Sequence, residues 1–124
     1  MNRKLKVFLV EDSLKIRSLL IEILQQTGQV DVVGFADRQT DALNQLRLIA
    51  WDVAIIDISL REGNGLPVLV GLQSDDKTYG TRIVLTSSPS SEMKTRTLAL
   101  GASAFFDKSS DLDLLIQYIQ RIEH

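Results

Sequence analysis

The amino-acid sequence predicts an α/β fold, built as a doubly wound parallel sheet with helices on both faces. Short apolar runs rich in Val, Ile, Leu and Phe alternate with segments whose apolar residues recur at helical spacing. Five such runs alternate with five such segments, which is typical of strands joined by right-handed crossover helices. The run WDVAIID at 51–57 is almost continuously apolar, as expected of a central strand covered on both faces.

The expected elements follow one another without a linker, a repeat or a low-complexity tract. Strands are expected at residues 5–10, 30–36, 51–57, 82–86 and 104–106. Helices are expected at residues 14–26, 40–50, 66–73, 90–100 and 111–123.

The first two helices have clear boundary signals. Asp12 or Ser13 is expected to cap the N-terminus of the first helix, since both side chains can accept hydrogen bonds from the free N–H groups there. Gly28 is expected to end that helix as a C-terminal cap. Asp37 is the expected cap of the second helix.

The last three helices are delimited in similar ways. Pro67 is tolerated in the first turn of the third helix, where its missing N–H has no partner to lose. Gly101 is expected to end the fourth helix, and Ser110 is expected to cap the fifth. The fifth helix has a clean apolar stripe formed by Leu112, Leu115, Ile116, Ile119 and Ile122.

The composition limits the classes of function. With 124 residues, 44% of them hydrophobic, the chain is expected to form one domain over residues 1–124. A net charge of −2 with scattered Lys and Arg does not favour direct binding to nucleic acid. Without cysteine, and with His124 as the one histidine, any bound metal must have oxygen ligands. No N-terminal apolar segment is long enough for a signal peptide or a membrane span, so a cytoplasmic protein without membrane contact is expected.

Polar residues end most of the predicted strands. The first strand ends in FLVEDS, so that Glu11 and Asp12 follow an apolar run directly. Asp57 ends the third strand, Thr86 ends the fourth, and Lys108 follows the fifth. Ligands of such sheets bind at the carboxyl ends of the strands, so these residues are expected to lie on one edge of the sheet.

The residue types at this edge predict a chemistry. Three carboxylates in one crevice repel each other unless a cation compensates them. Mg²⁺ fits, because it binds carboxylates and water while leaving positions open for phosphate oxygens. Lys108 adds a fixed positive charge that can pair with a phosphoryl oxygen or with Asp57, and Thr86 adds a hydroxyl donor. This set describes a phosphoryl-transfer site in which Asp57 is the nucleophile that forms an acyl phosphate.

Simpler interpretations of single residues stay open. Asp12 can serve as a helix cap alone, and Asp57 as an ordinary turn residue. Thr86 can simply begin a loop. Phe105 and Phe106 are most simply core residues, and alternation along a strand is expected to turn only one of them inward.

Five motifs together resemble the receiver domain of two-component response regulators, over essentially the whole chain. They are FLVED (8–12), AIID (54–57), GNGL (63–66), IVLTS (83–87) and GASAFFDK (101–108). Each motif alone is unspecific, whereas the five in this order are highly specific. The resemblance implies a flavodoxin-like five-stranded sheet with the order 2-1-3-4-5.

The resemblance also implies roles for individual residues. It makes Asp57 the phosphorylated aspartate, and Glu11 and Asp12 the acidic pair that holds Mg²⁺, with Asp12 as the closer ligand. The backbone carbonyl of Ser59 is a further expected metal ligand. In the same pattern Lys108 contacts the phosphoryl group, and Thr86 and Phe105 are the switch hydroxyl and the switch aromatic ring.

The function implied is that of a phosphoacceptor in signalling, which catalyses only its own phosphorylation and dephosphorylation. A sensor histidine kinase or a phosphotransfer protein would donate the phosphoryl group. Phosphorylation would alter the surface formed by the expected helix at 90–100, the strand at 104–106 and the helix at 111–123, which is also a possible homodimer face. The output would be a separate effector protein or a missing C-terminal output domain. The alternative is a pseudo-receiver that acts only as a protein-binding module.

Three positions depart from the usual family pattern. Ser109 stands where a proline in a cis peptide is common, and a cis bond before a non-proline residue costs about 2.5–4 kcal/mol, so the Lys108–Ser109 peptide is either trans or strained. Phe105 replaces a frequent tyrosine and lacks its hydroxyl. Glu11 replaces a frequent aspartate. None of these changes removes a residue needed for phosphorylation, which predicts an active receiver.

Two other classes with phosphate chemistry fit less well. A phosphatase of the haloacid-dehalogenase type would need a second acid two positions after its nucleophile, where this sequence has Ser59. A flavin carrier of similar fold would need a loop rich in glycine and hydroxyl groups after the first strand. Here that loop begins with Glu11 and Asp12, which would repel phosphate.

Overall fold

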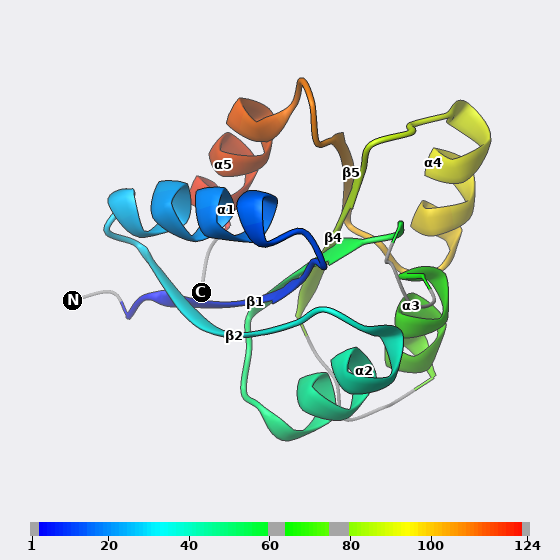
Figure 1. Cartoon of the computed structure of the whole chain (residues 1–124), viewed down its shortest axis with the longest axis horizontal. Coiled ribbons are helices and arrows are strands. Elements are labelled where there is room, and N and C mark those ends of the chain that lie inside the picture. Colours follow the sequence, from blue (N-terminus) through cyan, green and yellow to red (C-terminus); the bar gives the residue numbers. More distant parts are fainter. Residues whose placement is uncertain (1–2, 60–63, 75–79, 123–124) are drawn as a thin grey trace.

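The structure is a computed structural model that describes residues 3–59, 64–74 and 80–122. Within these residues strands and helices alternate strictly along the chain (Figure 1). The strands are β1 (Leu5–Val10), β2 (Val30–Ala36), β3 (Val53–Asp57), β4 (Thr81–Thr86) and β5 (Ala104–Asp107). The helices are α1 (Leu14–Gln26), α2 (Gln39–Leu48), α3 (Leu66–Gln73), α4 (Ser91–Ala99) and α5 (Leu112–Gln120).

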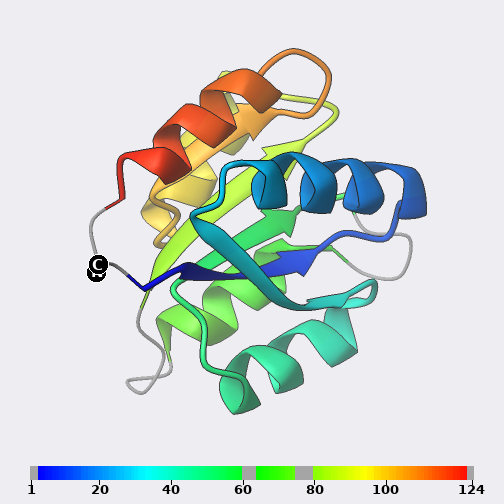
Figure 2. The ribbon, with the colours of Figure 1, turned by 90° about the vertical axis from the view of Figure 1, so that its left-hand side faces the viewer.

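The five strands form one parallel sheet in the order β2-β1-β3-β4-β5. This confirms the predicted fold class and the predicted strand order. The sheet carries helices on both sides, with α1 and α5 on one face and α2, α3 and α4 on the other (Figure 2). The strand order reverses between β1 and β3, so their carboxyl ends flank the crevice where ligands of such sheets bind.

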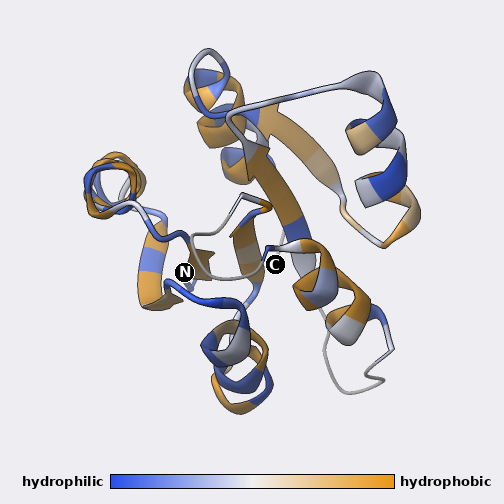
Figure 3. Cartoon of the chain, turned by 45° about the vertical axis from the view of Figure 1, so that its right-hand side comes forward, coloured by the Kyte–Doolittle hydropathy of each residue, from blue (hydrophilic) through white to orange (hydrophobic). Residues whose placement is uncertain are grey.

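Each face of the sheet has its own apolar core, because successive side chains of a strand point to opposite faces. In β3, where all five residues are buried, Val53 and Ile55 pack towards α1 and α5. Ala54 and Ile56 pack towards α2 and α3. The hydropathy colouring of Figure 3 accordingly shows apolar strands inside and helices with mixed surfaces outside. Among the described residues, no helix is both long and apolar enough to span a membrane.

The boundaries of α1 agree with the sequence prediction. Ser13 is the N-cap, and its hydroxyl oxygen accepts a hydrogen bond from the N–H of Ile16 (3.3 Å). Gly28 lies just beyond the end of the helix with φ of +71°, a backbone conformation that glycine adopts without steric strain.

Two predicted caps are wrong. Asp37 does not cap α2, because the helix begins at Gln39 and Arg38 takes the N-cap position, without a side-chain hydrogen bond. Ser110 does not cap α5, because the N-cap is Asp111. The Asp111 carboxylate instead accepts a hydrogen bond from the backbone N–H of Asp107 (3.0 Å), which ties the start of α5 back to the end of β5.

Candidate functional site

Five of the predicted site residues lie at the carboxyl edge of the sheet. Glu11 and Asp12 follow β1, Asp57 is the last residue of β3, Thr86 is the last of β4, and Lys108 follows β5. Because these four strands are neighbours and parallel, their carboxyl ends present these side chains to one region.

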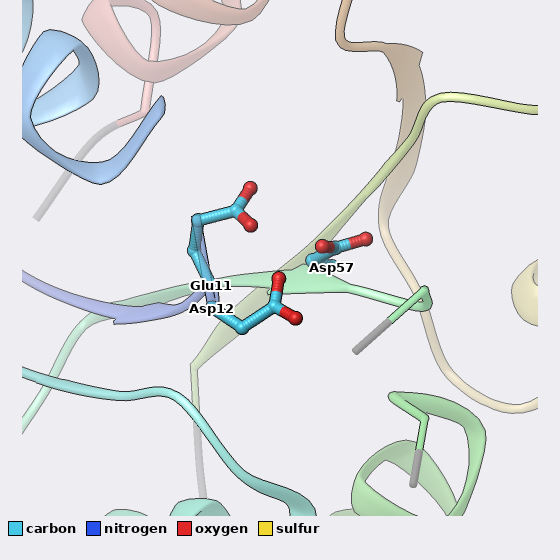
Figure 4. A group of neighbouring side chains, drawn as sticks. All are labelled: Glu11, Asp12 and Asp57. Atoms are coloured by element: carbon cyan, nitrogen blue, oxygen red, sulfur yellow. The ribbon is translucent and has the colours of Figure 1, made fainter. Parts of the chain in front are cut away.

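The acidic side chains form one cluster. One carboxylate oxygen each of Glu11, Asp12 and Asp57 lies within 4.8 Å of the others. Figure 4 shows the side chains of Glu11 and Asp12 from the end of β1 beside that of Asp57 from β3. Glu11 and Asp57 are almost fully buried, at 2% and 1% exposure, whereas Asp12 is partly exposed. The cluster therefore has two carboxylates removed from water and one in contact with it.

Lys108 is shared between the two buried carboxylates. Its ammonium nitrogen donates a hydrogen bond to Oδ2 of Asp57 (2.7 Å) and forms an ion pair with Oε1 of Glu11 (2.7 Å). The contact with Asp57 agrees with the sequence prediction, whereas the contact with Glu11 was not predicted. The backbone N–H of Lys108 also donates to the carbonyl of Thr86 (2.9 Å), which fixes the lysine against the end of β4.

Burial and charge shift the ionisation of both partners. Burial raises the pKa of Glu11 to about 7, and the nearby negative charge of Asp57 adds to this effect. The ammonium of Lys108 and the N–H of Ser13, which donates to Glu11 Oε2 (3.1 Å), oppose the rise. Burial alone would lower the pKa of Lys108, but its hydrogen bonds and ionic contacts with Asp57 and Glu11 outweigh burial and raise that pKa.

The cluster fits a hard divalent cation. Its donor set consists of carboxylate oxygens, the ligand type that Mg²⁺ prefers. The one ammonium of Lys108 is shared by Glu11 and Asp57, so it cannot balance both buried carboxylates when both are ionised. Oε1 of Glu11 is buried, and it contacts the Lys108 ammonium (2.7 Å), which Asp57 also contacts. Glu11, Asp12 and Asp57 are therefore the residues that would hold Mg²⁺.

Ser59 reaches the site through its backbone. Its N–H donates a hydrogen bond to Oδ1 of Asp57 (2.8 Å), which fixes the carboxylate against the loop after β3. The role of its carbonyl oxygen as a metal ligand stays a prediction. Gly65 also belongs to this loop, and a Cβ atom there would lie 2.6 Å from the carbonyl oxygen of Asp57. Only glycine permits this close approach, which explains the second glycine of the GNGL motif; Gly63 lies outside the described residues.

The two predicted switch residues lie on neighbouring strands. Thr86 is buried, and its hydroxyl oxygen accepts a hydrogen bond from the N–H of Ser88 (3.1 Å). Phe105 is half-buried and packs against the core beneath α2, α3 and α4. Phe106 packs on the opposite face, edge to face with Tyr118. The expectation that only one of the two rings packs inward is wrong, because helices cover both faces of the sheet.

The loop after β5 is ordered by Asp107 rather than by proline. The carboxylate of Asp107 accepts hydrogen bonds from the side chain (2.7 Å) and the backbone N–H (2.8 Å) of Ser109, and these bonds lower its pKa. Asp107 is thus a structural residue of this loop. The described residues contain no cis peptide bond, so the Lys108–Ser109 peptide is trans.

Arg17 is a residue near the site that sequence reasoning missed. Its guanidinium Nη1 donates a hydrogen bond to the backbone carbonyl of Glu11 (2.9 Å), and its guanidinium carbon lies 4.0 Å from the centroid of the Phe35 ring. Charged residues on an amphipathic helix usually face water, so the pattern of α1 gave no signal for this contact.

Comparisons with known proteins agree with this geometry. Residues 7–120 match the family model of the response regulator receiver domain. The chain is 31% identical over 106 residues to a protein-glutamate methylesterase/protein-glutamine glutaminase of Methanospirillum hungatei, a match that covers 84% of this chain and 31% of the relative. It is 33% identical over 103 residues to the DNA-binding transcriptional activator DevR/DosR of Mycobacterium tuberculosis, covering 83% of this chain and 47% of the relative. The chain thus spans less than half the length of these relatives.

Solved structures with the same fold include several receiver domains. The response regulator domain of Thermotoga maritima CheB superposes with a TM-score of 0.85 at 22% identity, covering 98% of this chain and all of the other (100%). The receiver domain of the NarL regulator from Mycobacterium tuberculosis gives 0.83 at 21% identity, with 98% and 100% coverage. The phosphorylated cyanobacterial phytochrome response regulator RcpA gives 0.76 at 25% identity, with 94% and 89% coverage. Together with the family match, the acidic cluster and the strand order, this places the chain in the family of response regulator receiver domains.

Proposed function

We propose that this chain is a phosphoacceptor of a two-component system, in which Asp57 receives a phosphoryl group in a Mg²⁺-dependent reaction. The observation that carries the proposal is the buried Asp57 carboxylate, which shares the ammonium of Lys108 with Glu11 and lies in one cluster with Asp12. A nucleophilic carboxylate, an oxygen-ligand metal site and a fixed cation are the parts that phosphoryl transfer needs.

Different residues of the site have different proposed roles. Glu11, Asp12, Asp57 and the carbonyl of Ser59 would hold Mg²⁺, which when bound neutralises charge on the phosphoryl oxygens. The N–H of Ser59 holds Oδ1 of Asp57 and so limits rotation of the carboxylate. Lys108 contacts Oδ2 of Asp57 and would move this contact to a phosphoryl oxygen once Asp57 is modified.

The modified site would act on the neighbouring surface through Thr86 and Phe105. A phosphoryl group adds charge and acceptor oxygens, which would attract the Thr86 hydroxyl away from the N–H of Ser88. The Phe105 ring would then turn into the space that Thr86 leaves, and the surface of α4, β5 and α5 would shift between two existing states. Beryllofluoride, a phosphoryl mimic, should shift the amide resonances of residues 86–108 in a nuclear magnetic resonance spectrum. Unshifted amides there would refute this coupling.

The partners follow from the same proposal. A sensor histidine kinase or a phosphotransfer protein donates the phosphoryl group in the cytoplasm. The output is a downstream effector protein or an output domain, as the larger size of the matched methylesterase and transcriptional activator suggests. The surface of α4, β5 and α5 carries the exposed side chains of Leu98 and Leu114 and is the proposed face for an effector or for a second copy of the chain.

Intact-mass measurement after incubation with acetyl phosphate tests the proposal. The wild type should gain one phosphoryl group with Mg²⁺ present and none when Mg²⁺ is chelated. Asp57→Asn should gain none. Asp37→Asn is the matched control, because Asp37 follows the carboxyl end of β2 but is exposed and lies outside the cluster, and it should be modified like the wild type. A wild type that stays unmodified would favour the pseudo-receiver, which acts by binding alone.

A further inference from the structure

Arg17 links three parts of the molecule next to the acidic cluster. It belongs to α1, its guanidinium donates to the backbone carbonyl of Glu11 (2.9 Å), and it lies over the ring of Phe35 from β2 (4.0 Å). Phe35 is 46% exposed, so its ring contributes only part of its surface to the core. Stacking on Arg17 gives this exposed ring a defined contact.

The hydrogen bond from Arg17 is the second of two that hold the backbone around Glu11. The N–H of Glu11 donates to the carbonyl of Ala36 in β2 (2.9 Å), and its carbonyl accepts from Arg17. Both peptide groups that flank Glu11 are therefore held, one by β2 and one by α1. The second of these is the Glu11–Asp12 peptide, whose plane sets the direction in which Asp12 leaves the strand.

Arginine suits this position better than lysine. A planar guanidinium can donate to a carbonyl while its face stacks on an aromatic ring, whereas an ammonium is a point charge that cannot stack in this way. Phe35 in turn is held by the pairing of β2 with β1, where it lies opposite Leu9. The ring thus limits the orientations of the guanidinium, and the guanidinium limits those of the Glu11–Asp12 peptide.

We propose that Arg17, supported by Phe35, is a positioning residue for the metal site, which holds the Glu11–Asp12 peptide so that both carboxylates face the ion. The inference rests on the proposed function, since it assumes that the acidic cluster binds Mg²⁺. Groups that orient metal ligands typically change metal affinity by 10- to 100-fold when they are removed.

Charge and positioning predict opposite effects of removing Arg17, which makes the proposal testable. A positive charge near an acidic cluster opposes the binding of a cation, so loss of the charge alone should leave Mg²⁺ affinity unchanged or slightly raise it. Loss of positioning should lower the affinity. Lys15 provides the matched control, because it is an exposed cation in the same first turns of α1.

The experiment is a calorimetric titration of the purified chain with MgCl₂. Arg17→Met should weaken Mg²⁺ binding about tenfold. Phe35→Leu, which leaves the hydrogen bond without its stacking partner, should weaken it about threefold. Arg17→Lys should restore part of the affinity lost in Arg17→Met, and Lys15→Met should bind Mg²⁺ at least as tightly as the wild type.

A second readout needs no metal. In amide spectra of the metal-free protein, Arg17→Met should shift or broaden the resonances of Asp12 and Ser13, whereas Lys15→Met should leave them in place. Equal Mg²⁺ affinity of Arg17→Met and Lys15→Met would overturn the inference while leaving the proposed function intact. A wild type that binds no Mg²⁺ would overturn both. If Arg17→Met does not fold, the Mg²⁺ affinities of Arg17→Lys and Phe35→Leu are compared with that of the wild type. Wild-type affinity in both variants would overturn the inference.

Discussion

The two edges of the sheet each carry a cation paired with a carboxylate, in very different surroundings. At the amino edge Arg3 contacts Asp52 (2.8 Å), with side chains 58% and 21% exposed. At the carboxyl edge Lys108 contacts Asp57 (2.7 Å), with side chains 13% and 1% exposed. The distances are nearly equal, so burial and the neighbouring charges make the difference between the two pairs.

The amino-edge pair joins chain segments. Asp52 accepts from Arg3 and also from the backbone N–H of Lys6 (2.8 Å), which ties the start of β3 to β1. The carboxyl-edge pair includes a second buried acid, Glu11, so one ammonium cannot balance the cluster. The exposed pair links two chain segments, whereas the buried carboxylates share one ammonium and can be neutralised further by another cation.

The largest effect is expected from Lys108→Met. The variant leaves Asp57 and Glu11 buried without their cation, and loss of one partner of a buried ion pair destabilises by about 3 kcal/mol. Urea unfolding at pH 8 without Mg²⁺ measures this loss. Saturating Mg²⁺ should restore part of the stability, because it replaces the missing positive charge. A loss below about 1 kcal/mol would mean that the buried pair behaves like a surface pair.

The pH dependence of Mg²⁺ binding should show the next largest effect. In the folded, metal-free protein the pKa of Glu11 is about 7, above its ordinary value of 4.5. The folded state therefore binds this proton more tightly than the unfolded state, and the resulting stabilisation is complete below about pH 4.5 and is lost as the pH rises through about 7.

Mg²⁺ must displace this proton, so its affinity should be about tenfold higher at pH 8 than at pH 6. Calorimetric titration at both values measures this. The variant Glu11→Gln, which has no proton to displace at this position, should show nearly equal affinities. An equal affinity of the wild type at both pH values would contradict a raised pKa of Glu11.

The smallest effect is expected from Arg3→Met at the amino edge. Exposed ion pairs contribute at most about 1 kcal/mol, so the free energy of unfolding measured in urea should fall by less than that amount. The loss should be smaller still in high salt. Mg²⁺ affinity should not change, because Arg3 lies at the other edge of the sheet. A loss of stability as large as that of Lys108→Met would contradict the proposed difference between the two ion pairs.

Much of this arrangement could be predicted from the sequence because local patterns determine it. Alternating apolar periods predicted the parallel sheet, and the positions of Asp57 and Lys108 after apolar runs predicted their meeting at one edge. Caps were harder, since Asp111 and not Ser110 occupies the N-cap position of α5, and one residue separates Asp37 from α2. Such boundaries depend on tertiary contacts, for example the bond from the N–H of Asp107 to Asp111.

Other contacts between distant segments could not be predicted. The sharing of Lys108 by Glu11 and Asp57 depends on the depth at which each side chain is buried. The bond from Arg17 to the carbonyl of Glu11 depends on how α1 docks on the sheet, and its stacking on Phe35 depends on the pairing of β2 with β1. The spacing of residues along the chain determines none of these contacts.

The most direct test of the central claim is to locate the modified residue. Borohydride reduces an acyl phosphate of aspartate to homoserine, which peptide mass spectrometry can identify at a single position. After treatment with acetyl phosphate and Mg²⁺, we expect homoserine at position 57 alone, and none when Mg²⁺ is chelated. Reduction products at position 11 or 12, or none anywhere in the chain, would contradict the assignment of Asp57 as the phosphoacceptor.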